Sequence, residues 1–312
     1  MRAALLTRIR NYFHEQDVLE VDTPILSSAA TTDPFIESFK TCYTGPGAGD
    51  GKPLYLHTSS EFFMKRLLAA GSGPIYNLAH VFRNGEFGAR HNPEFMMLEW
   101  YRPGLDHHAL MDEVDDLLAV VLDGLADYRP AQRISYREWF VEGTGLDPWV
   151  DSGTAFRQFA SQQLGESLPA LDEDDMDGWL DLIVTHWLEP RLGTAAQFVF
   201  DYPPSQASLA RLRGGEQPVA ERFELYFGAV ELANGFHELA DADEQQQRFA
   251  ADNVCRTKRG QPQMPADEAL IGALAHGLPD CSGVALGFDR LLMVAMEASR
   301  IEATMPFGFD RA

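Results

Sequence analysis

Apolar residues recur at helical spacing at the start of the chain. Over residues 2–17, four of them fall on one face: Leu5, Ile9, Tyr12 and Phe13. This spacing predicts an amphipathic helix that packs on a larger body. The extended segment 18–26 follows, and Pro24 restricts it to an edge strand or a break.

Short apolar or alternating runs later in the chain predict strands. They are PLYLHTSSEFF (53–63), IYNLAHVFR (75–83), EFMMLEWY (94–101), AQFVFDYP (196–203), ERFELYFGAVELANGFHEL (221–239) and CSGVALGF (281–288). A short helix at 64–73 and a polar helix at 244–258 lie between strands. Residues 106–191 are helical in pattern, and we expect them to form a helical insertion. Because few runs alternate as strand, helix and strand, we predict one α+β domain over 1–312, with a mainly antiparallel sheet flanked by helices.

The composition narrows the function. The chain has 312 residues, 45% of them hydrophobic, and a formal charge of -22 from 47 acidic and 25 basic residues. Proteins that bind a nucleic-acid backbone normally present a basic face, so we expect no extensive tRNA binding. The acidity either aids solubility alone or suits a basic protein partner. Three isolated cysteines argue against disulfides and zinc, and the absence of a long apolar run or signal peptide predicts a cytoplasmic protein without a membrane segment.

The first stretch with chemical potential is VFRNGEFGARHNPEFMMLEWY (81–101), two strands joined by a long polar loop. Arg83 ends the first strand and can offer a bidentate guanidinium to a phosphate. Phe95, on the returning strand, can offer a ring face to a base. Taken alone, the segment favours ligand binding, and an exposed charged hairpin is the alternative.

The second stretch is VELANGFHELAD, in which Asn234-Gly235 is a strong hairpin signal. If these residues form the turn, Glu231 faces Glu238 on one side of the ribbon, where two carboxylates would repel each other. A shared Mg²⁺ would relieve the repulsion, and a solvated surface pair is the alternative. His237 lacks the partner spacing of a metal site, so we expect a structural role for it.

The third stretch is SGVALGFDRLLMVAM, a strand of small residues followed by an apolar helix. Gly287 lets the backbone approach a ligand, and Arg290 adds charge near the helix N-terminus, which suits a polyphosphate. A glycine turn with Asp289 as the helix cap is the alternative.

The first helix and the Pro-containing strand, followed by the three stretches in this order, resemble motifs 1, 2 and 3 of class II aminoacyl-tRNA synthetases. FRN, RHNPEF, EWY and ELANGFHEL resemble the lysyl branch. TSSEFFMKRLL, HNPEFMMLEWYRP, PPSQASLA, VAERFELYF, EQQQRF and DCSGVALGFDRL are similar to a narrower family, the elongation factor P (R)-beta-lysine ligases. That resemblance runs from about Arg2 to the terminal FDRA.

The resemblance implies a function for each matching residue. ATP would be bound by Arg83, Asn84, Gly85, His91, Asn92, Phe95, Glu231, Leu232, Gly287 and Arg290. Glu231 and Glu238 would hold Mg²⁺, and these two with Arg83 and Arg290 would be the catalytic set. The amino acid would be bound by Ser59, Ser60, Glu61, Glu99, Tyr101, Glu238 and Ala285. Glu99 and Tyr101 would receive its distal ammonium, as an acidic group plus a hydroxyl should.

Two positions depart from the lysyl-tRNA synthetase pattern. Many of those enzymes read FRNEG where this chain reads FRNGE, so Gly85 stands at the position of their glutamate. The contact that this glutamate makes is therefore not assigned here, and Glu86 is the candidate residue to make it. Ala285 stands where those enzymes commonly have glycine, and the ligase family shares the alanine. Its added Cβ would reshape the α-carbon end of the pocket, which is a route to preferring a β-amino acid.

The resemblance implies a homodimer, formed through motif 1, that uses ATP and Mg²⁺ to activate (R)-β-lysine or lysine and transfers it to elongation factor P. Motif 1 begins at the first residues, so we expect no anticodon-binding domain. A truncated lysyl-tRNA synthetase, a non-catalytic amino-acid sensor and a ligase with another amine acceptor are the alternatives. The sequence favours neither form of lysine and identifies no base for the transfer step.

Overall fold

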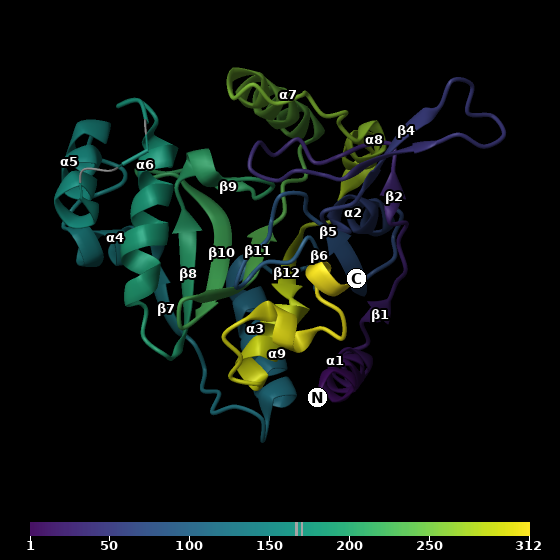
Figure 1. The fold of residues 1–312 in the computed structure, drawn as a ribbon, viewed down its shortest axis with the longest axis horizontal. Coiled ribbons are helices and arrows are strands. Elements are labelled where there is room, and N and C mark those ends of the chain that lie inside the picture. The colour runs from purple at the N-terminus through teal and green to yellow at the C-terminus, as the bar shows by residue number, and fades with distance from the viewer. Residues whose placement is uncertain (166–167, 170) are drawn as a thin grey trace.

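A mixed, mostly antiparallel sheet forms the centre of the fold (Figure 1). The computed structural model describes residues 1–165, 168–169 and 171–312. In spatial order the strands are β1 (Leu19–Glu20), β5 (Ile75–Phe82), β6 (Glu94–Pro103), β12 (Cys281–Gly287), β11 (Val230–His237), β10 (Val219–Phe227), β8 (Ala196–Tyr202) and β7 (Gln132–Ser135), with β9 (Leu212–Arg213) on β10. Only β1–β5 and β7–β8 pair in parallel in the described residues. The predicted α+β fold is confirmed.

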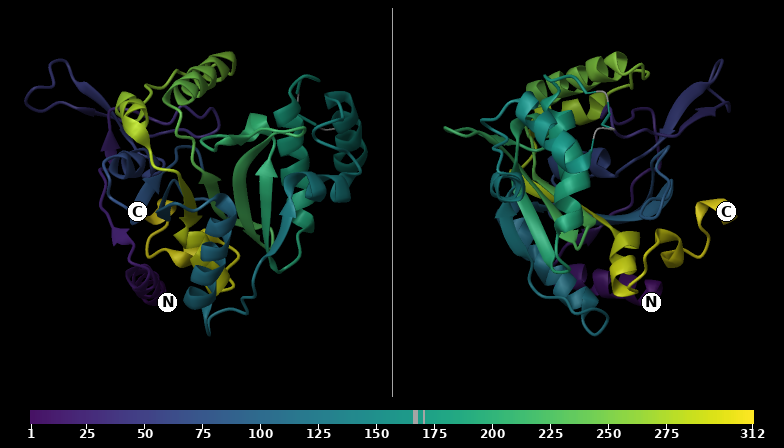
Figure 2. Two further views of the ribbon diagram at one scale, coloured as in Figure 1. Left: turned by 180° about the vertical axis from the view of Figure 1, so that it is seen from behind. Right: turned by 60° about the vertical axis from the view of Figure 1, so that its left-hand side comes forward.

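A second, smaller sheet stands apart from the first. It contains β2 (Leu26–Ser27), β4 (Lys52–Leu56) and β3 (Lys40–Tyr43) in that order. The β3–β4 hairpin projects from the body of the molecule (Figure 2).

One core joins the sheet to three helices, which are α1 (Arg2–Glu15), α3 (His107–Leu122) and α9 (Phe288–Ala295). The four apolar residues predicted to share a face of the first helix are the ones that α1 buries. Strand residues at alternate positions, among them Leu98, Trp100 and Leu286, complete this core, so the intervening residues point to the opposite face.

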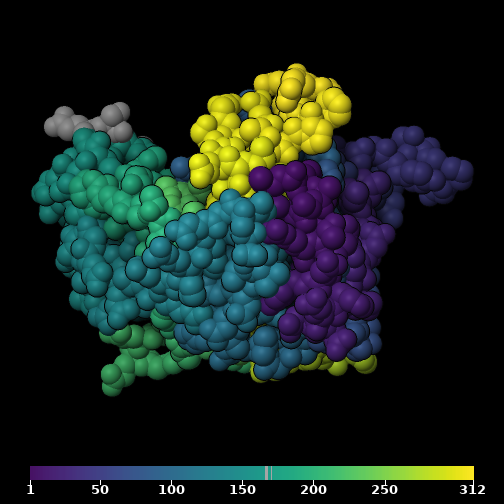
Figure 3. Space-filling view, turned by 90° about the horizontal axis from the view of Figure 1, so that it is seen from below, coloured from purple at the N-terminus to yellow at the C-terminus, as the bar shows by residue number. Residues whose placement is uncertain are grey.

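The two ends of the chain meet at this core. Asp289 is buried in α9, where it pairs with Arg2 and accepts a 2.7 Å hydrogen bond from the backbone N–H of Met96. It therefore ties α9 to α1 and β6 and does not cap its own helix. In the view from below, the N-terminal region that contains α1 borders both the region of α3 and the C-terminal segment (Figure 3).

The opposite face carries three further helices near β5, β6 and β12. They are α2 (Glu61–Ala69), α7 (Ala242–Lys258) and α8 (Glu268–Gly277). A separate apolar cluster fixes them, with Met64 and Leu68 of α2 packed against Leu270 and Leu274 of α8. The chain shows no helix among its described residues that could cross a membrane.

The segment expected to form one helical insertion, 106–191, is divided in the structure. Its first helix, α3, belongs to the main core, and β7 extends the central sheet. The remainder packs as a helical layer over β8 and β10 with its own core (Figure 1). This layer, which we call the insertion layer, contains α4 (Tyr136–Thr144), α5 (Gly153–Leu164), α6 (Met176–Ile183), a π-helical turn (Val184–Leu188) and a 3₁₀ turn (Glu189–Arg191).

The predicted hairpin turn at Asn234-Gly235 is wrong. Both residues lie inside β11, which pairs with β10 on one side and β12 on the other. The chain turns instead at Gly228, which has a φ of 58°, and Ala229. Gly235 is required in the strand because a Cβ there would lie 2.3 Å from the ring of Phe223.

Candidate active site

The sheet face opposite the main core lines an open cleft of about 950 Å³. Alternate residues of four neighbouring strands form its floor: Phe95 and Met97 of β6, Ala285 and Gly287 of β12, Asn234 and Phe236 of β11, and Arg222, Glu224 and Tyr226 of β10. The loop between β5 and β6, the start of α2 and the insertion layer form its walls.

A β-bulge brings Glu231 into this cleft. In the ladder between β10 and β11, Leu225 pairs with Ala233 but the next residue, Tyr226, pairs with Glu231, so Leu232 is an extra residue. A bulge of this kind shifts the alternation of side chains by one position. Glu231 and Leu232 both line the cleft. Beyond the bulge the cleft-facing residues of β11 are even-numbered, and the shift at the bulge explains why the odd-numbered Glu231 faces the same side.

Arg290 joins the three predicted stretches. Its guanidinium donates to the backbone oxygen of Glu231 at 2.9 Å and to Oε2 of Glu231 at 3.1 Å, and lies 2.8 Å from Nε2 of His91. Burial and the charge of Arg290 lower the pKa of His91, so the ring is neutral at pH 7 and can accept this hydrogen bond. Gly287 also lines the cleft, and a Cβ there would make ordinary van der Waals contact with the Arg290 side chain, at 3.5 Å.

Arg83 lies where the sequence predicted a phosphate-binding arginine. It ends β5, its guanidinium is 5.3 Å from the centroid of the Phe95 ring, and both residues line the cleft. Gly85 has a φ of 84°, which favours glycine, and Glu86 lines the cleft with its carboxylate 3.9 Å from Arg83. The reversed Gly-Glu order thus keeps a glutamate near Arg83.

Two predicted nucleotide contacts have other neighbours in the structure. Asn84 is exposed, its backbone N–H donates to Glu37, and neither Asn84 nor Gly85 lines the cleft. Asn92 is buried at the cleft wall, but its side chain donates to the backbone of Glu94 and accepts from the backbone N–H of Phe309. Asn92 therefore fastens the C-terminal residues to the loop.

The predicted amino-acid site is assembled beside the cleft, between β6 and the start of α2. Glu99 is buried, and its carboxylate accepts hydrogen bonds from the Ser59 hydroxyl and from the backbone N–H of Ser60 at 2.7 Å. The Ser60 hydroxyl donates to the same carboxylate oxygen. These donors stabilise a buried negative charge without neutralising it.

A lysine of the protein lies between the other two carboxylates. Nζ of Lys65 is 2.5 Å from Glu61 and 2.6 Å from Oε2 of Glu238. Burial raises the pKa of Glu238 to about 8, although Lys65 opposes the shift. Burial alone would lower the pKa of Lys65, but the two carboxylates raise it above its ordinary value, so the ammonium stays charged.

Tyr101 and Glu238 reach this site because Gly283 is opposite them. A Cβ on Gly283 would lie 2.2 Å from the Tyr101 ring and 2.5 Å from Oε1 of Glu238, an atom without a hydrogen-bond partner among the described residues. Ala285 pairs with Glu99 across the ladder and lines the cleft.

The predicted pairing of Glu231 with Glu238 is wrong. Six residues of extended strand lie between them, which corresponds to roughly 20 Å. Glu238 lies with Lys65 beside the predicted amino-acid pocket, whereas Glu231 contacts Arg290. The carboxylates of Glu189 and Glu231 are close enough for their charges to interact. Burial raises the pKa of Glu189 to about 7, and the negative charges of Glu224 and Glu231 add to this shift.

Sequence reasoning missed several residues of the site. Glu224 and Arg222 alternate along β10, a signal that was available once this strand was assigned to the cleft face. Gln245 lines the cleft, is 1% exposed, and neither polar atom of its amide has a hydrogen-bond partner in the part of the chain that the structure describes. Lys65 and Glu189 had no sequence signal, because only the tertiary fold brings them to their partners.

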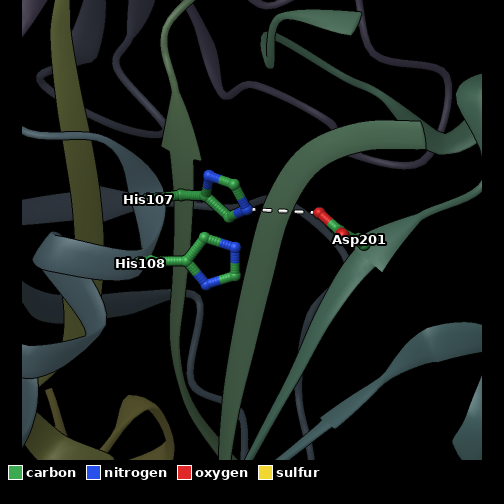
Figure 4. A group of neighbouring side chains, drawn as sticks. All are labelled: His107, His108 and Asp201. Atoms are coloured by element: carbon green, nitrogen blue, oxygen red, sulfur yellow. Dashed lines mark hydrogen bonds and ion pairs between the residues drawn. The ribbon is translucent and has the colours of Figure 1, made fainter. Parts of the chain in front are cut away.

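A histidine cluster lies where the start of α3 meets β8, β10 and β11. His107 at the start of α3 is 3.2 Å from Asp201 of β8, with His108 beside it (Figure 4). His107 also lies near Glu221 and His237, a grouping that could hold a metal ion. Arg211 and Arg213 already bind the Glu221 carboxylate, at 3.0 and 3.2 Å. Their charges disfavour a cation, so the expected structural role of His237 agrees with this ion-pair network.

Comparison with known proteins places the chain in a family. A family model described as tRNA synthetases class II (D, K and N) matches residues 1–311, and the chain belongs to this family. Relatives named elongation factor P--(R)-beta-lysine ligase are similar to it over its full length and over 94% of theirs. The identity is 49% for the protein of Pectobacterium carotovorum subsp. carotovorum (strain PC1), and 50% for those of Edwardsiella ictaluri (strain 93-146) and Salmonella typhi. The resemblance found in the sequence is confirmed.

Proposed function

We propose that this ATP-dependent ligase activates (R)-β-lysine or α-lysine as an aminoacyl adenylate and transfers it to the ε-amine of a lysine on elongation factor P. One observation carries the proposal. Beside the cleft, Glu61 and Glu238 share the ammonium of Lys65, and the buried carboxylate of Glu99 has only uncharged hydrogen-bond donors among the described residues. When all three carboxylates are ionised, one ammonium leaves two negative charges, and a further cation in the site would favour that ionised form over the proton that the raised pKa of Glu238 retains.

A lysine-type substrate carries two ammonium groups and one carboxylate, so it can supply that balance. Buried charges require partners, and an ammonium needs three acceptors. The Glu99 carboxylate and the Tyr101 hydroxyl would accept from the distal ammonium. Glu61 lines the cleft wall and would accept from the other ammonium, which leaves the substrate carboxylate directed toward the nucleotide.

Charge neutralisation and positioning would carry the activation step. An oxygen of the amino-acid carboxylate attacks the α-phosphorus of ATP, and the bond to the bridging oxygen of the pyrophosphate breaks. Arg83 would bind the α-phosphate, Arg290 the terminal phosphates, and Phe95 would stack on the adenine. Fixed cations of this kind stabilise the charge that develops on the phosphate oxygens.

Glu224 and Glu231 fit a magnesium site. Both carboxylates line the open cleft, where Glu231 pairs with Arg290 and Glu224 with Arg222, and carboxylate oxygens are the ligands that Mg²⁺ prefers. Bound there, Mg²⁺ would neutralise phosphate charge. Glu238 is excluded from this pair by its contact with Lys65.

In the transfer step the acceptor amine attacks the carbonyl carbon of the adenylate, an amide bond forms, and AMP leaves with the former anhydride oxygen. The names of the relatives and the charge of -22 support a protein acceptor over tRNA. A cytoplasmic location belongs to the same proposal.

A homodimer through α1 and the strands that follow it is also part of the proposal. Leu19, Ile25 and Leu26 are 58%, 42% and 47% exposed there, which leaves an apolar face for a second copy. Light scattering at micromolar concentration tests this point, and a monomer would contradict it.

The function is tested by ATP–pyrophosphate exchange with (R)-β-lysine and α-lysine, followed by incubation with unmodified elongation factor P and, separately, tRNA. We expect exchange with one or both amino acids and a mass increase on the protein. Transfer to tRNA alone would identify a synthetase instead, and the lack of any exchange would refute adenylation.

A further inference from the structure

The cleft is lined on one side by residues of the insertion layer and the strand beneath it. They are Tyr136 of α4, Asp177 and Asp181 of α6, and Tyr202 of β8, none of which was predicted to bind the nucleotide or the amino acid. Arg222 of β10 lines the cleft as well. We call this region the acidic lobe.

The two aspartates of the acidic lobe have only neutral partners. Asp177 accepts a 2.7 Å hydrogen bond from the Ser205 hydroxyl, and Asp181 accepts a 3.0 Å bond from the Gln206 amide. Within the described part of the chain, neither aspartate has an ion pair, because Arg222 pairs with Glu224. Asp181 remains exposed to solvent, but desolvation and the charge of Asp177 outweigh the opposing charge of Arg222 and raise its pKa to about 6, so a cation in the lobe would favour the ionised form.

An unsatisfied hydroxyl is directed into the same space. Tyr136 is 1% exposed, and its hydroxyl has no hydrogen-bond partner in the described residues. The negative charges of Asp181, Glu224 and Asp177 act on it more strongly than the positive charge of Arg222. Buried polar atoms are normally paired, so an orphan hydroxyl that lines a cavity indicates a missing ligand. Burial raises the pKa of Tyr136 well above its ordinary value, so the neutral hydroxyl can accept a hydrogen bond from a cation.

The acidic lobe leads to the nucleotide region. α6 continues directly into the π-helical turn, and Glu189, which follows it, lies 3.5 Å from the Tyr226 hydroxyl in the main cleft. Carboxylates therefore run from the lobe to the place where the adenylate would form. An isolated π-helical turn of this kind is frequent at functional sites.

We propose that the acidic lobe binds the primary ammonium of the acceptor lysine before transfer. Asp177 and Asp181 supply the charge, and the Tyr136 hydroxyl supplies a further acceptor. The inference rests on the proposed function, because it requires an amine as the second substrate. It assigns acceptor recognition to the insertion layer, opposite the wall that binds the activated amino acid.

The test uses the full chain with Asp177→Asn/Asp181→Asn and, separately, Tyr136→Phe. Glu142→Gln is the matched control, because Glu142 is exposed on α4 of the same layer and has no ion pair among the described residues. Two reactions are measured: ATP–pyrophosphate exchange, and transfer to elongation factor P or to Nα-acetyl-lysine methylamide as a small amine probe.

We expect the double variant to raise the KM of both acceptors about tenfold or more, the loss of about one charge-assisted hydrogen bond. Tyr136→Phe should raise it severalfold, and exchange should stay within about twofold in both. Equal losses in exchange and transfer, or unchanged acceptor KM values, would overturn the acidic lobe as the acceptor site. Failure of the wild-type chain to transfer to either amine would refute the proposed acceptor together with the lobe, whereas wild-type transfer with unaffected variants refutes the lobe alone.

Discussion

Substitution of Glu99 by glutamine tests the amino-acid site directly. The change keeps the size of the side chain and removes its charge, at a residue that is 2% exposed. A hydrogen bond to a charged partner contributes about 1.5–3 kcal/mol. If Glu99 receives the distal ammonium, the KM for (R)-β-lysine or lysine in pyrophosphate exchange should therefore rise roughly 10- to 150-fold, while the KM for ATP stays the same.

A substrate without the distal ammonium separates recognition from misfolding. For (R)-β-lysine that substrate is 3-aminohexanoate, and for α-lysine it is norleucine. The wild-type chain should discriminate strongly against them, and in Glu99→Gln the discrimination should shrink by the factor that the diamine loses. Glu94→Gln is the control, because Glu94 lies on the same strand with an exposed side chain, 2.9 Å from His80. If Glu99→Gln weakens both kinds of substrate equally, the carboxylate does not bind the distal ammonium.

Three further predictions concern the same site. Lys65→Met should lower the free energy of unfolding by about 3–5 kcal/mol in urea denaturation, because it leaves the carboxylates of Glu61 and Glu238 without their cation. A loss below about 1 kcal/mol would contradict the buried ion pairs of Lys65 with these two residues. Because the pKa of Glu238 is raised, its protonated form stabilises the fold fully at low pH, and this contribution is lost as the pH rises through about 8. The free energy of unfolding of the wild-type chain should therefore fall as the pH rises to about 8, and it should fall less steeply in Glu238→Gln. Parallel pH profiles of the two proteins would exclude Glu238 as the cause. Gly283→Ala should raise the amino-acid KM far more than the ATP KM, since its Cβ displaces Tyr101; equal effects on both would show a general distortion.

The helices and strands could be predicted because burial on one face leaves a clear periodicity. The four buried residues of α1 were found in this way, as were β5, β6, β8, β10 and β12. The division of the segment 106–191 could not be predicted. α3 and the helices of the insertion layer have similar amphipathic patterns, and a pattern does not say which apolar surface a helix will cover.

The Asn234-Gly235 error has a specific physical cause. An Asn-Gly pair favours a turn in an isolated hairpin, but β11 lies between two other strands and gains backbone hydrogen bonds on both edges. The Asn234 side chain accepts from Arg222 at 3.2 Å, and Gly235 makes room for Phe223. Tertiary contacts therefore overrode the local preference, and the error carried over to the pairing of Glu231 with Glu238.

The single extra residue at Leu232 gives β11 two registers along one strand. Beyond it, Asn234, Phe236 and Glu238 serve the cleft and the amino-acid site, and before it Glu231 joins the same surface only because the phase of the strand changes there. The residues proposed for nucleotide chemistry and those proposed for amino-acid choice therefore lie on one strand, on opposite sides of the bulge. Single substitutions on one side leave the alternation of the other side unchanged, whereas a one-residue insertion or deletion between them would turn Glu231 toward the apolar core and separate the two proposed functions.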